Sequence, residues 1–254
     1  MKVGLIGFGQ TGRAVATVIL QHPDFELEWV LRRSNKQAGR TVSEVLEVDN
    51  CNSKGTVISM NSVSIDNLLD EKRVDCIIDF SSEDGIFEYG RQAAKRGIRI
   101  VSAVSHYEEK QLSFLKQLAE KTVVFWSPNI TLGVNYLIFA AKFLKNIAPF
   151  VDIEIIEEHF KQKHGVSGTA LKMAEALGLK QNKINSVRAG GIVGKHQVIF
   201  GFKYQTIRLT HESISREAFG NGVVFVAENL AGKPSGYYTY EDILKPFLNE
   251  RTPN

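Results

Sequence analysis

The stretch KVGLIGFGQTG, residues 2–12, decides how the N-terminal half of this chain folds. Its first part, residues 2–6, is a short apolar run typical of a buried strand, and helical spacing of apolar residues follows the stretch. Between strand and helix, Gly7, Gly9 and Gly12 have the spacing G-x-G-x-x-G, which is informative only in that context. The stretch therefore predicts a strand, a tight turn and a helix that together bind a dinucleotide.

Each glycine of this turn is required for a different physical reason. Gly7 permits a tight turn, Gly9 lets a pyrophosphate approach the backbone, and Gly12 lets the helix pack closely on the strand. The helix N-terminus then offers N–H groups and a partial positive charge to phosphates. An ordinary glycine-rich turn without a ligand is the less favoured alternative. The predicted cofactor-binding residues of the turn are Gly7, Phe8, Gly9, Gln10, Thr11 and Gly12.

The end of the second predicted strand bears on which cofactor binds. NAD-preferring sites usually carry an acidic residue there, about 20 residues past the glycines, which bonds the ribose 2′-OH. In this chain Arg32 and Arg33 occupy that place, 20 and 21 residues beyond Gly12. Two guanidinium groups suit a 2′-phosphate, because each offers paired donors to its oxygens. The arginines favour NADPH and leave NADH open, and a solvated basic loop is the alternative.

Strand and helix continue to alternate as far as residue 126. Short apolar runs typical of buried strands occur at 2–6, 26–31, 74–80, 98–101 and 123–126. Helical spacing separates several of them, at 12–21, 85–96 and 108–121. Continuously apolar strands that alternate with helices predict a parallel sheet covered on both faces.

The pattern changes after Ser127, Pro128 and Asn129. A helix is predicted at 134–146, a strand at 151–157 and a second helix at 169–177. Three stretches with period-two alternation and short connections follow, SVRAGGIV, HQVIFGF and YQTIRLTHES. They predict an antiparallel or mixed sheet with one open face.

The predicted fold class is α/β, with an N-terminal Rossmann-like parallel sheet domain and a second α+β domain with an open mixed sheet. We expect the dinucleotide-binding domain at residues 1–130, completed by C-terminal helices within 217–254. The second domain is expected at residues 131–216.

The composition limits the classes of partner. Net charge is +3, from 31 Lys and Arg against 28 Asp and Glu, which is too small a surplus to argue for nucleic acid. The two cysteines have no metal-binding spacing and fit a reducing compartment. No run approaches the roughly 18 apolar residues of a membrane span. We expect a cytoplasmic protein without a metal site, a nucleic-acid partner or a membrane partner.

A second informative stretch is EEHFKQKHGVSGTA, residues 157–170. His159, Lys163 and a Ser167-Gly168-Thr169 turn stand close together just before a helix-like run. Such a group can bind an anion and supply a proton, since either base can donate one. The alternative is a polar loop that closes with an ordinary helix cap.

The order of motifs resembles the dihydrodipicolinate reductase family over nearly the whole chain. After the glycine turn come DFSS at 79–82, SPNITLGVN at 127–135 and the stretch at 157–170. SVRAGGIVGKHQVIF at 186–200 and LTHESISREAFGNG at 209–222 complete the series. The resemblance implies hydride transfer from a nicotinamide cofactor to a cyclic dicarboxylate imine, in lysine and diaminopimelate biosynthesis.

The resemblance also implies roles for particular residues. Ser167, Gly168 and Thr169 match the turn that binds a substrate carboxylate. His159 and Lys163 match the family's catalytic pair, with Lys163 as proton donor and His159 as its partner. Asp79, Ser81, Ser102 and Val104 lie in segments that border the cofactor. The second domain is implied to bind substrate and to form a homotetramer through its sheet.

Three departures from the family pattern keep other functions open, and one of them is Ser102-Ala103-Val104-Ser105 in place of the family's Gly-Thr-Thr-Gly. Phe160 replaces the second histidine of the family's H-H-x-x-K motif. The segment from His164 to Val166 is one residue shorter than usual and lacks an Asp and a Pro. A paralogous reductase of another small carboxylate or imine is therefore the first alternative. A nucleotide-binding protein that has lost turnover is the second, and the retained His159, Lys163 and Ser-Gly-Thr turn argue against it.

Overall fold

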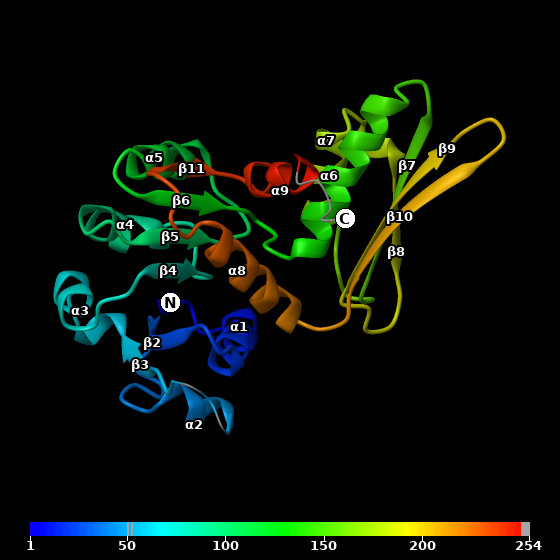
Figure 1. The fold of residues 1–254 in the computed structure, drawn as a ribbon. Helices are drawn as coiled ribbons and strands as arrows, with labels where there is room; N and C mark the ends of the chain where they lie inside the picture. The colour runs from blue at the N-terminus through cyan, green and yellow to red at the C-terminus, as the bar shows by residue number, and fades with distance from the viewer. Residues whose placement is uncertain (50, 52, 250–254) are drawn as a thin grey trace. The chain divides into compact units, whose positions relative to one another are not determined.

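The structure is a computed structural model that describes residues 1–49, 51 and 53–249, without the side chain of residue 249 (Figure 1). The chain divides into two compact units. The larger unit consists of Met1–Ile130 and Phe219–Asn254, and the smaller unit is Thr131–Ala218. The larger unit is therefore built from two separate parts of the chain.

The larger unit contains a seven-stranded sheet in the order β11-β6-β5-β4-β1-β2-β3, and every neighbouring pair is parallel. The strands are β1 (Lys2–Ile6), β2 (Glu26–Arg32), β3 (Thr56–Ser59), β4 (Cys76–Asp79), β5 (Arg99–Ser102), β6 (Val123–Trp126) and β11 (Gly236–Tyr238). Strand β4 is buried along its whole length, as expected for a strand covered on both faces.

The helices of the larger unit are α1 (Gln10–Gln21), α2 (Val42–Leu46), α3 (Ile65–Glu71), α4 (Gly85–Lys95), α5 (Glu109–Ala119), α8 (Glu217–Asn229) and α9 (Tyr240–Asn249). Helices α3, α4 and α5 pack on one face of the sheet, over a core that includes Trp29, Ile77 and Ile100. In the sheet, β2 and β3 lie on one side of β1, and β4, β5 and β6 lie on the other side. Because crossovers between parallel strands are right-handed, α1 therefore lies on the opposite face of the sheet from α4. Helix α8 packs against α1, where Gly220 meets Val18.

The smaller unit contains a four-stranded mixed sheet in the order β10-β9-β7-β8. Its strands are β7 (Asp152–His159), β8 (Ile184–Arg188), β9 (Gly194–Gly201) and β10 (Thr206–Ser213). Helices α6 (Leu132–Ile147) and α7 (Gly168–Ala176) pack on one face over a core that includes Ile155, Met173 and Phe200. The residues of β7 and β9 alternate between buried and partly exposed, so the second face is open. The predicted fold class is confirmed.

One boundary matters for the site. The sequence predicted a strand that ends at Glu157, and this is wrong by two residues. Pairing with β8 carries β7 to His159, opposite Arg188. His159 therefore belongs to the strand, where its backbone direction is set by the sheet.

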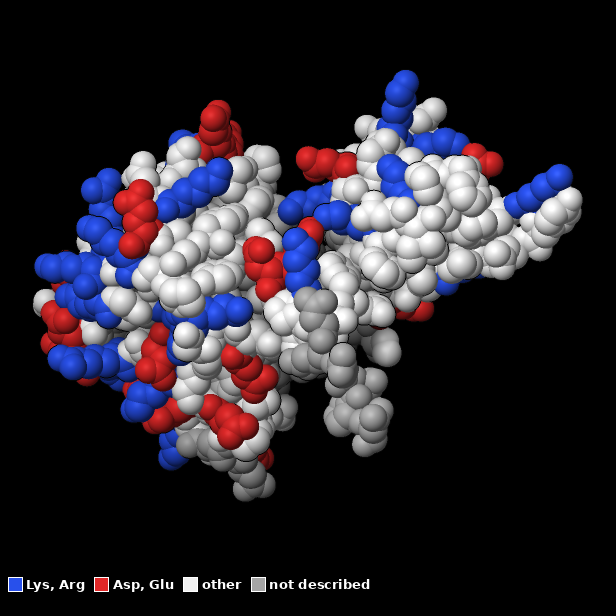
Figure 2. Space-filling model, turned by 45° about the horizontal axis from the view of Figure 1, so that its top comes forward, with Lys and Arg blue, Asp and Glu red and all other residues white. Residues whose placement is uncertain are grey.

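Surface charge and hydropathy add two facts. On the face shown in Figure 2, basic and acidic side chains are interspersed over the larger unit. Among the helices formed by described residues, none is both long enough and apolar enough to cross a membrane.

Candidate active site

The glycine turn after β1 has the geometry that its sequence predicts. Gly7 has a φ of +96°, and a Cβ there would lie 2.4 Å from the carbonyl oxygen of Phe80. Its N–H donates to the carbonyl of Leu31 on the neighbouring strand, at 2.9 Å. A Cβ at Gly12 would lie 2.1 Å from the carbonyl oxygen of Gly7. Both positions therefore require glycine, because any side chain would enter the backbone of the turn.

The N-terminus of α1 is open to a ligand. Gly9 is its N-cap, no side chain caps the helix, and no acidic residue stands in its first turn. A Cβ at Gly9 would meet nothing within 4 Å. A helix N-terminus offers N–H donors and a partial positive charge, so this position fits the phosphates of a dinucleotide.

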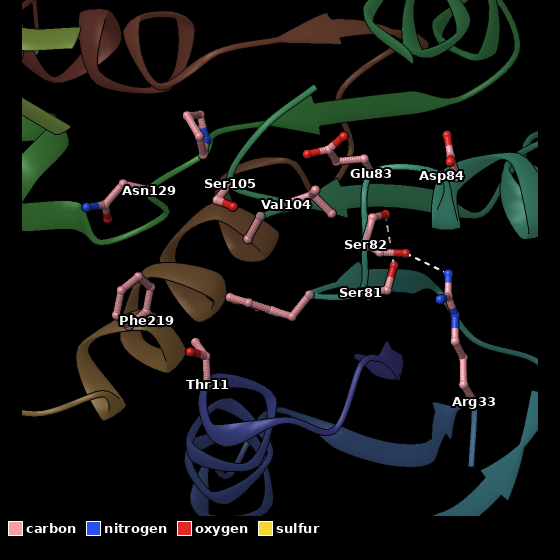
Figure 3. A pocket seen from close by; sticks show the side chains of 13 residues that line it. Thr11, Arg33, Ser81, Ser82, Glu83, Asp84, Val104, Ser105, Asn129 and Phe219 are labelled. Carbon is pink, nitrogen blue, oxygen red and sulfur yellow. Dashed lines mark hydrogen bonds between the residues drawn. The ribbon is translucent and has the colours of Figure 1, made fainter. Parts of the chain in front are cut away.

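A pocket of about 720 Å³ lies at the carboxyl ends of the strands of the larger unit (Figure 3). This edge, at the point where strand order reverses, is where open α/β sheets bind ligands. Its lining comes from the segments that follow β1, β2, β4, β5 and β6 and includes Thr11, Arg33, Ser81, Ser82, Val104, Ser105 and Asn129. Four predicted cofactor residues, Thr11, Arg33, Ser81 and Val104, thus share one pocket.

The two arginines after β2 have different surroundings. Arg33 is exposed, lines the pocket and donates from Nη2 to Ser82 Oγ at 2.8 Å (Figure 3). Arg32 donates to Gln37 Oε1 at 3.3 Å, and its guanidinium carbon lies 6.0 Å from the ring centre of the buried Phe8. Arg33 is therefore the arginine that lines the pocket, and Arg32 packs beside the ring of Phe8.

Two predicted cofactor residues have buried side chains. Asp79 is fully buried, and its carboxylate accepts from Ser81 N at 2.8 Å and from Tyr89 Oη at 2.9 Å. Burial raises the pKa of Asp79. Ser102 is also fully buried, with its hydroxyl 2.8 Å from that of Tyr107. Both side chains stabilise the loops behind the pocket lining, and the prediction that their segments border the cofactor stays a prediction.

In the smaller unit, His159 lies on the helix-covered face of the sheet and belongs to a buried polar network. Its Nδ1 contacts Oε2 of Glu157, which stands two residues earlier on the same face. The other Glu157 oxygen accepts from Ser186 Oγ at 2.6 Å and from the guanidinium of Arg188. Burial alone would raise the pKa of Glu157, but hydrogen bonds from Arg188, Ser186 and His159 lower it to about 2. Glu157 is therefore a carboxylate at neutral pH.

Burial lowers the pKa of His159 by more than the nearby Glu157 carboxylate raises it. The neutral ring then carries its proton on Nδ1, which faces that carboxylate. Nε2 is left as a hydrogen-bond acceptor, 3.1 Å from where a Cβ at Gly194 would lie. A side chain at position 194 would crowd this nitrogen, and glycine leaves it accessible.

The loop from 160 to 166 carries Lys163. Its N–H donates to the carbonyl of Phe160 at 3.0 Å, which closes a turn. Its carbonyl oxygen accepts from Arg188 Nε at 3.0 Å, and Arg188 is paired with His159 across the sheet, so the loop lies beside the strand end that carries His159. The side chain of Phe160, which replaces the family's second histidine, is 39% exposed.

Ser167 begins α7. Its hydroxyl accepts from the N–H of Ala170 at 3.1 Å and lies 3.1 Å from Nε2 of His196. A Cβ at Gly168 would meet nothing within 4 Å, so a ligand can approach the helix N-terminus there. His196 is buried, its ring centre is 5.2 Å from that of His159, and burial lowers its pKa to about 3.

The structure thus brings His159, Lys163 and Ser167 together in one part of the smaller unit. The analysis of the sequence did not identify Glu157 and Ser186 as members of this group. A signal was present, since Glu157 precedes His159 by two residues and Ser186 precedes Arg188 by two. Residues two apart on a strand share a face. Elsewhere, His22, Asp24 and Glu228 place three ligand atoms within 4.8 Å of one another, an arrangement that exposed acidic groups often adopt without a metal ion.

Solved structures are similar to this chain in fold. A dihydrodipicolinate reductase from Paenisporosarcina sp., determined with dipicolinate bound, matches with a TM-score of 0.75 at 23% identity, over 95% of this chain and 98% of its own. An amine dehydrogenase from Mycobacterium smegmatis matches with a TM-score of 0.63 at 12% identity, over 96% of this chain and 95% of its own. At these identities the likeness shows the fold: with the glycine turn after β1, the larger unit belongs to the Rossmann-type class of folds.

Sequence comparisons identify the family within that class. The model described as "Dihydrodipicolinate reductase, N-terminus" matches residues 1–130, and the model described as "Dihydrodipicolinate reductase, C-terminus" matches residues 130–244. A protein of Caldanaerobacter subterraneus named 4-hydroxy-tetrahydrodipicolinate reductase is 32% identical, over 93% of this chain and 95% of its own length. A protein of Methanocaldococcus jannaschii with the same name is 30% identical over 98% of each chain. The chain belongs to the dihydrodipicolinate reductase family, and the predicted resemblance is confirmed.

Proposed function

We propose that this protein reduces 4-hydroxy-tetrahydrodipicolinate to tetrahydrodipicolinate with NADPH or NADH, in lysine and diaminopimelate biosynthesis. The observation that carries the proposal is that the Lys163 loop and Ser167 both lie beside the strand end that carries His159, in a chain of this family. The overall reaction adds a hydride and a proton to the substrate and releases water. The site must therefore bind two carboxylates and supply one proton.

The α7 N-terminus and the loop before it supply groups of the right kind for a dicarboxylate. Ser167, Gly168 and Thr169 form the start of the helix, where backbone N–H groups and the helix dipole favour an anion. Lys163 adds a compact positive charge. We infer that one carboxylate binds at the helix start and that Lys163 pairs with the substrate beside it.

Lys163 is the better proton donor of the two bases. Burial lowers the pKa of His159, which favours the neutral ring, and with Nδ1 bonded to the Glu157 carboxylate the neutral ring presents Nε2 as a hydrogen-bond acceptor. A bound reduced nicotinamide would supply the hydride. Lys163 then delivers the proton that completes the reduction, and the acceptor Nε2 of His159 orients the ammonium or the substrate.

The larger unit has the features that a dinucleotide requires. The open helix start at Gly9 fits the pyrophosphate, and Arg33 at the pocket edge fits a 2′-phosphate. No acidic residue stands at the end of β2 to bond a ribose 2′-OH. These observations favour NADPH over NADH.

We further infer a cytoplasmic homotetramer that forms through the open face of the smaller unit's sheet. Two aliphatic residues, Ile156 and Ile199, are only partly buried on neighbouring strands of that face. Association through this face would remove them from water. Light scattering of the wild type and of an Ile199→Glu variant tests the assembly, and a monomeric wild type would contradict it.

The direct test of function is oxidation of NADPH with substrate made in place from pyruvate and aspartate semialdehyde by the preceding synthase. Turnover should depend on both the synthase product and this protein. Pyridine-2,6-dicarboxylate, a planar dicarboxylate, should compete with the substrate.

A paralogous reductase of another small carboxylate or imine is the second candidate, favoured by Phe160 and the short 164–166 segment. It would replace the first if the protein binds cofactor but neither turns over this substrate nor binds the planar dicarboxylate.

A further inference from the structure

We propose that Arg188 is a positioning residue that ties the Lys163 loop to the buried Glu157–His159 pair. The inference rests on the proposed function, because it assigns Arg188 to the same site. Arg188 would act through Lys163 and His159, and contact with the substrate is no part of its role.

The contacts of Arg188 reach both parts of the site. Its Nη2 binds the buried carboxylate of Glu157, the group that faces Nδ1 of His159. Its Nε donates to the carbonyl oxygen of Lys163 at 3.0 Å, and Nη2 also donates to the carbonyl oxygen of Gly165. One guanidinium therefore joins the strand that carries His159 to two points on the loop that carries Lys163.

The guanidinium is suited to this bridge by its shape. It presents donors in a rigid plane, whereas an ammonium is a single point of charge. The Glu157 side chain is 0% exposed and that of Arg188 is 19% exposed. The pairing of β7 with β8 places Arg188 directly opposite His159, so the sheet itself sets the position of the guanidinium.

Within the loop itself, the N–H of Lys163 bonds to the carbonyl of Phe160 at 3.0 Å. Gly165 stands in the left-handed region with a φ of +64°, and residues 160–166 contain no proline to restrict the backbone. Two backbone bonds attach its beginning, from Ala189 N to His159 O at 3.0 Å and from Lys161 N to Gly190 O at 3.1 Å. The later part of the loop, where Lys163 stands, is attached to β8 by the Arg188 side chain.

The test compares Arg188→Gln and Arg188→Lys with Lys180→Gln. Lys180 is the control, since it is an exposed positive charge of the smaller unit that stands after α7, outside the open face of the sheet. Four measurements are made: steady-state kinetics for kcat and KM, titration with NADPH for its affinity, amide exchange of Lys161 and Lys163, and the NMR titration of His159. The charged and titratable groups around His159 are Glu157 on β7, Lys163 in the loop, Arg188 on β8 and His196 on β9.

We expect Arg188→Gln to lower kcat/KM about tenfold or more and to speed amide exchange at Lys163 about tenfold or more. His159 should titrate at higher pH, because a nearby positive charge is lost. NADPH affinity should stay at the wild-type value, and Lys180→Gln should match the wild type throughout. Arg188→Lys should restore the His159 titration but only part of kcat, since a point charge cannot reach all three acceptors.

Three results would overturn the proposal: wild-type exchange at Lys163 in Arg188→Gln, an unchanged His159 titration, or full recovery of kcat by lysine. If Arg188→Gln alone unfolds, the Glu157→Gln/Arg188→Gln double variant removes the unpaired buried charge and should still show fast exchange at Lys163. If the wild type does not turn over the substrate, the proposed function fails, while exchange and titration still decide the role of Arg188.

Discussion

At the scale of single residues, the structure separates side chains that face a ligand from side chains that hold others in place. Asp79 and Ser102 stand next to residues that line the pocket, but their own side chains are buried. The sequence identified the right segments because a polar turn after a buried strand lies at the carboxyl edge of a sheet. The sequence could not show which side chains face the pocket, because the backbone torsion angles of each turn decide which side chain points into the protein.

A first prediction concerns Lys163. Replacing it by alanine should lower kcat and raise KM together, because the proposal gives it both charge pairing and proton delivery. The loss should be about 3 kcal/mol or more in kcat/KM, roughly a hundredfold or greater. Steady-state kinetics with the coupled substrate measures both constants. Lys161→Ala changes an exposed lysine of the same loop and should stay close to wild type. Equal losses in the two variants would count against a specific role.

A second prediction separates the two arginines after β2. Arg33→Ala should weaken NADPH binding about tenfold and leave NADH binding little changed, since only NADPH carries the 2′-phosphate that its exposed guanidinium would bind. Arg32→Ala should have the smaller effect on this preference, because Arg32 packs beside Phe8. Isothermal titration of each variant with each cofactor tests this. If Arg33→Ala weakens both cofactors equally, the arginine does not discriminate between them.

At the scale of secondary-structure elements, a third prediction contrasts two glycines of one turn. Gly9→Val should abolish nucleotide binding and leave the melting temperature nearly unchanged, because its side chain would enter open space that a pyrophosphate needs. Gly12→Ala should instead destabilise the fold by about 2 kcal/mol, since its Cβ would lie 2.1 Å from the carbonyl of Gly7. Thermal melts and cofactor titrations distinguish the two. A Gly9→Val protein that still binds NADPH would remove the turn from the cofactor site.

The elements that the sequence predicted well are those with a strong period. Helix α4, for example, was expected at 85–96 and occurs at Gly85–Lys95. The segment from residue 42 to residue 71 was left without assignment, although it contains α2, β3 and α3. Strand β3 has four residues and β11 has three. Strand β4, also of four residues, was recognisable as a continuous apolar run, whereas β3 has only two aliphatic residues and β11 has none, so only pairing with β2 and β6 makes them strands.

The candidate site likewise has a part that one stretch of sequence predicts and a part that depends on the pairing of strands. His159, Lys163 and the Ser-Gly-Thr turn are close in sequence, so a single stretch contained the signal. Glu157 was visible in that stretch as one of two acids, and its link to Ser186 and Arg188 depends on the parallel pairing of β7 with β8. A contact between strands about 30 residues apart follows from sheet register, which no local pattern specifies.

At the scale of the whole molecule, the buried histidines predict sensitivity to acid. The folded-state pKa of His196 is lowered to about 3 from the ordinary 6.5, mainly by burial. Between pH 3 and pH 6.5, the unfolded chain therefore binds a proton at His196 that the folded chain does not bind. The contribution of this group to the free energy of unfolding is complete above pH 6.5 and decreases as pH falls toward 3. The slope in that window is about 1.4 kcal/mol of unfolding free energy per pH unit.

Urea unfolding of the wild type and of His196→Gln over this window tests the fourth prediction. The glutamine does not titrate and can still donate to Ser167, so the variant should show a shallower dependence on pH. Parallel curves for the two proteins would mean that His196 contributes nothing to the acid sensitivity.

The two-part construction of the larger unit has a consequence for how the protein is made. A ribosome releases residues 1–130 first, then the whole of 131–218, and only then the segment that contains α8, β11 and α9. Until β11 arrives, β6 is an unpaired edge, and the ring of Phe125 lacks its neighbour Tyr240, 5.3 Å away in the finished protein. A nascent chain with an open, apolar strand edge is prone to aggregate or to recruit chaperones. The smaller unit, continuous in sequence, can fold before its neighbour is complete.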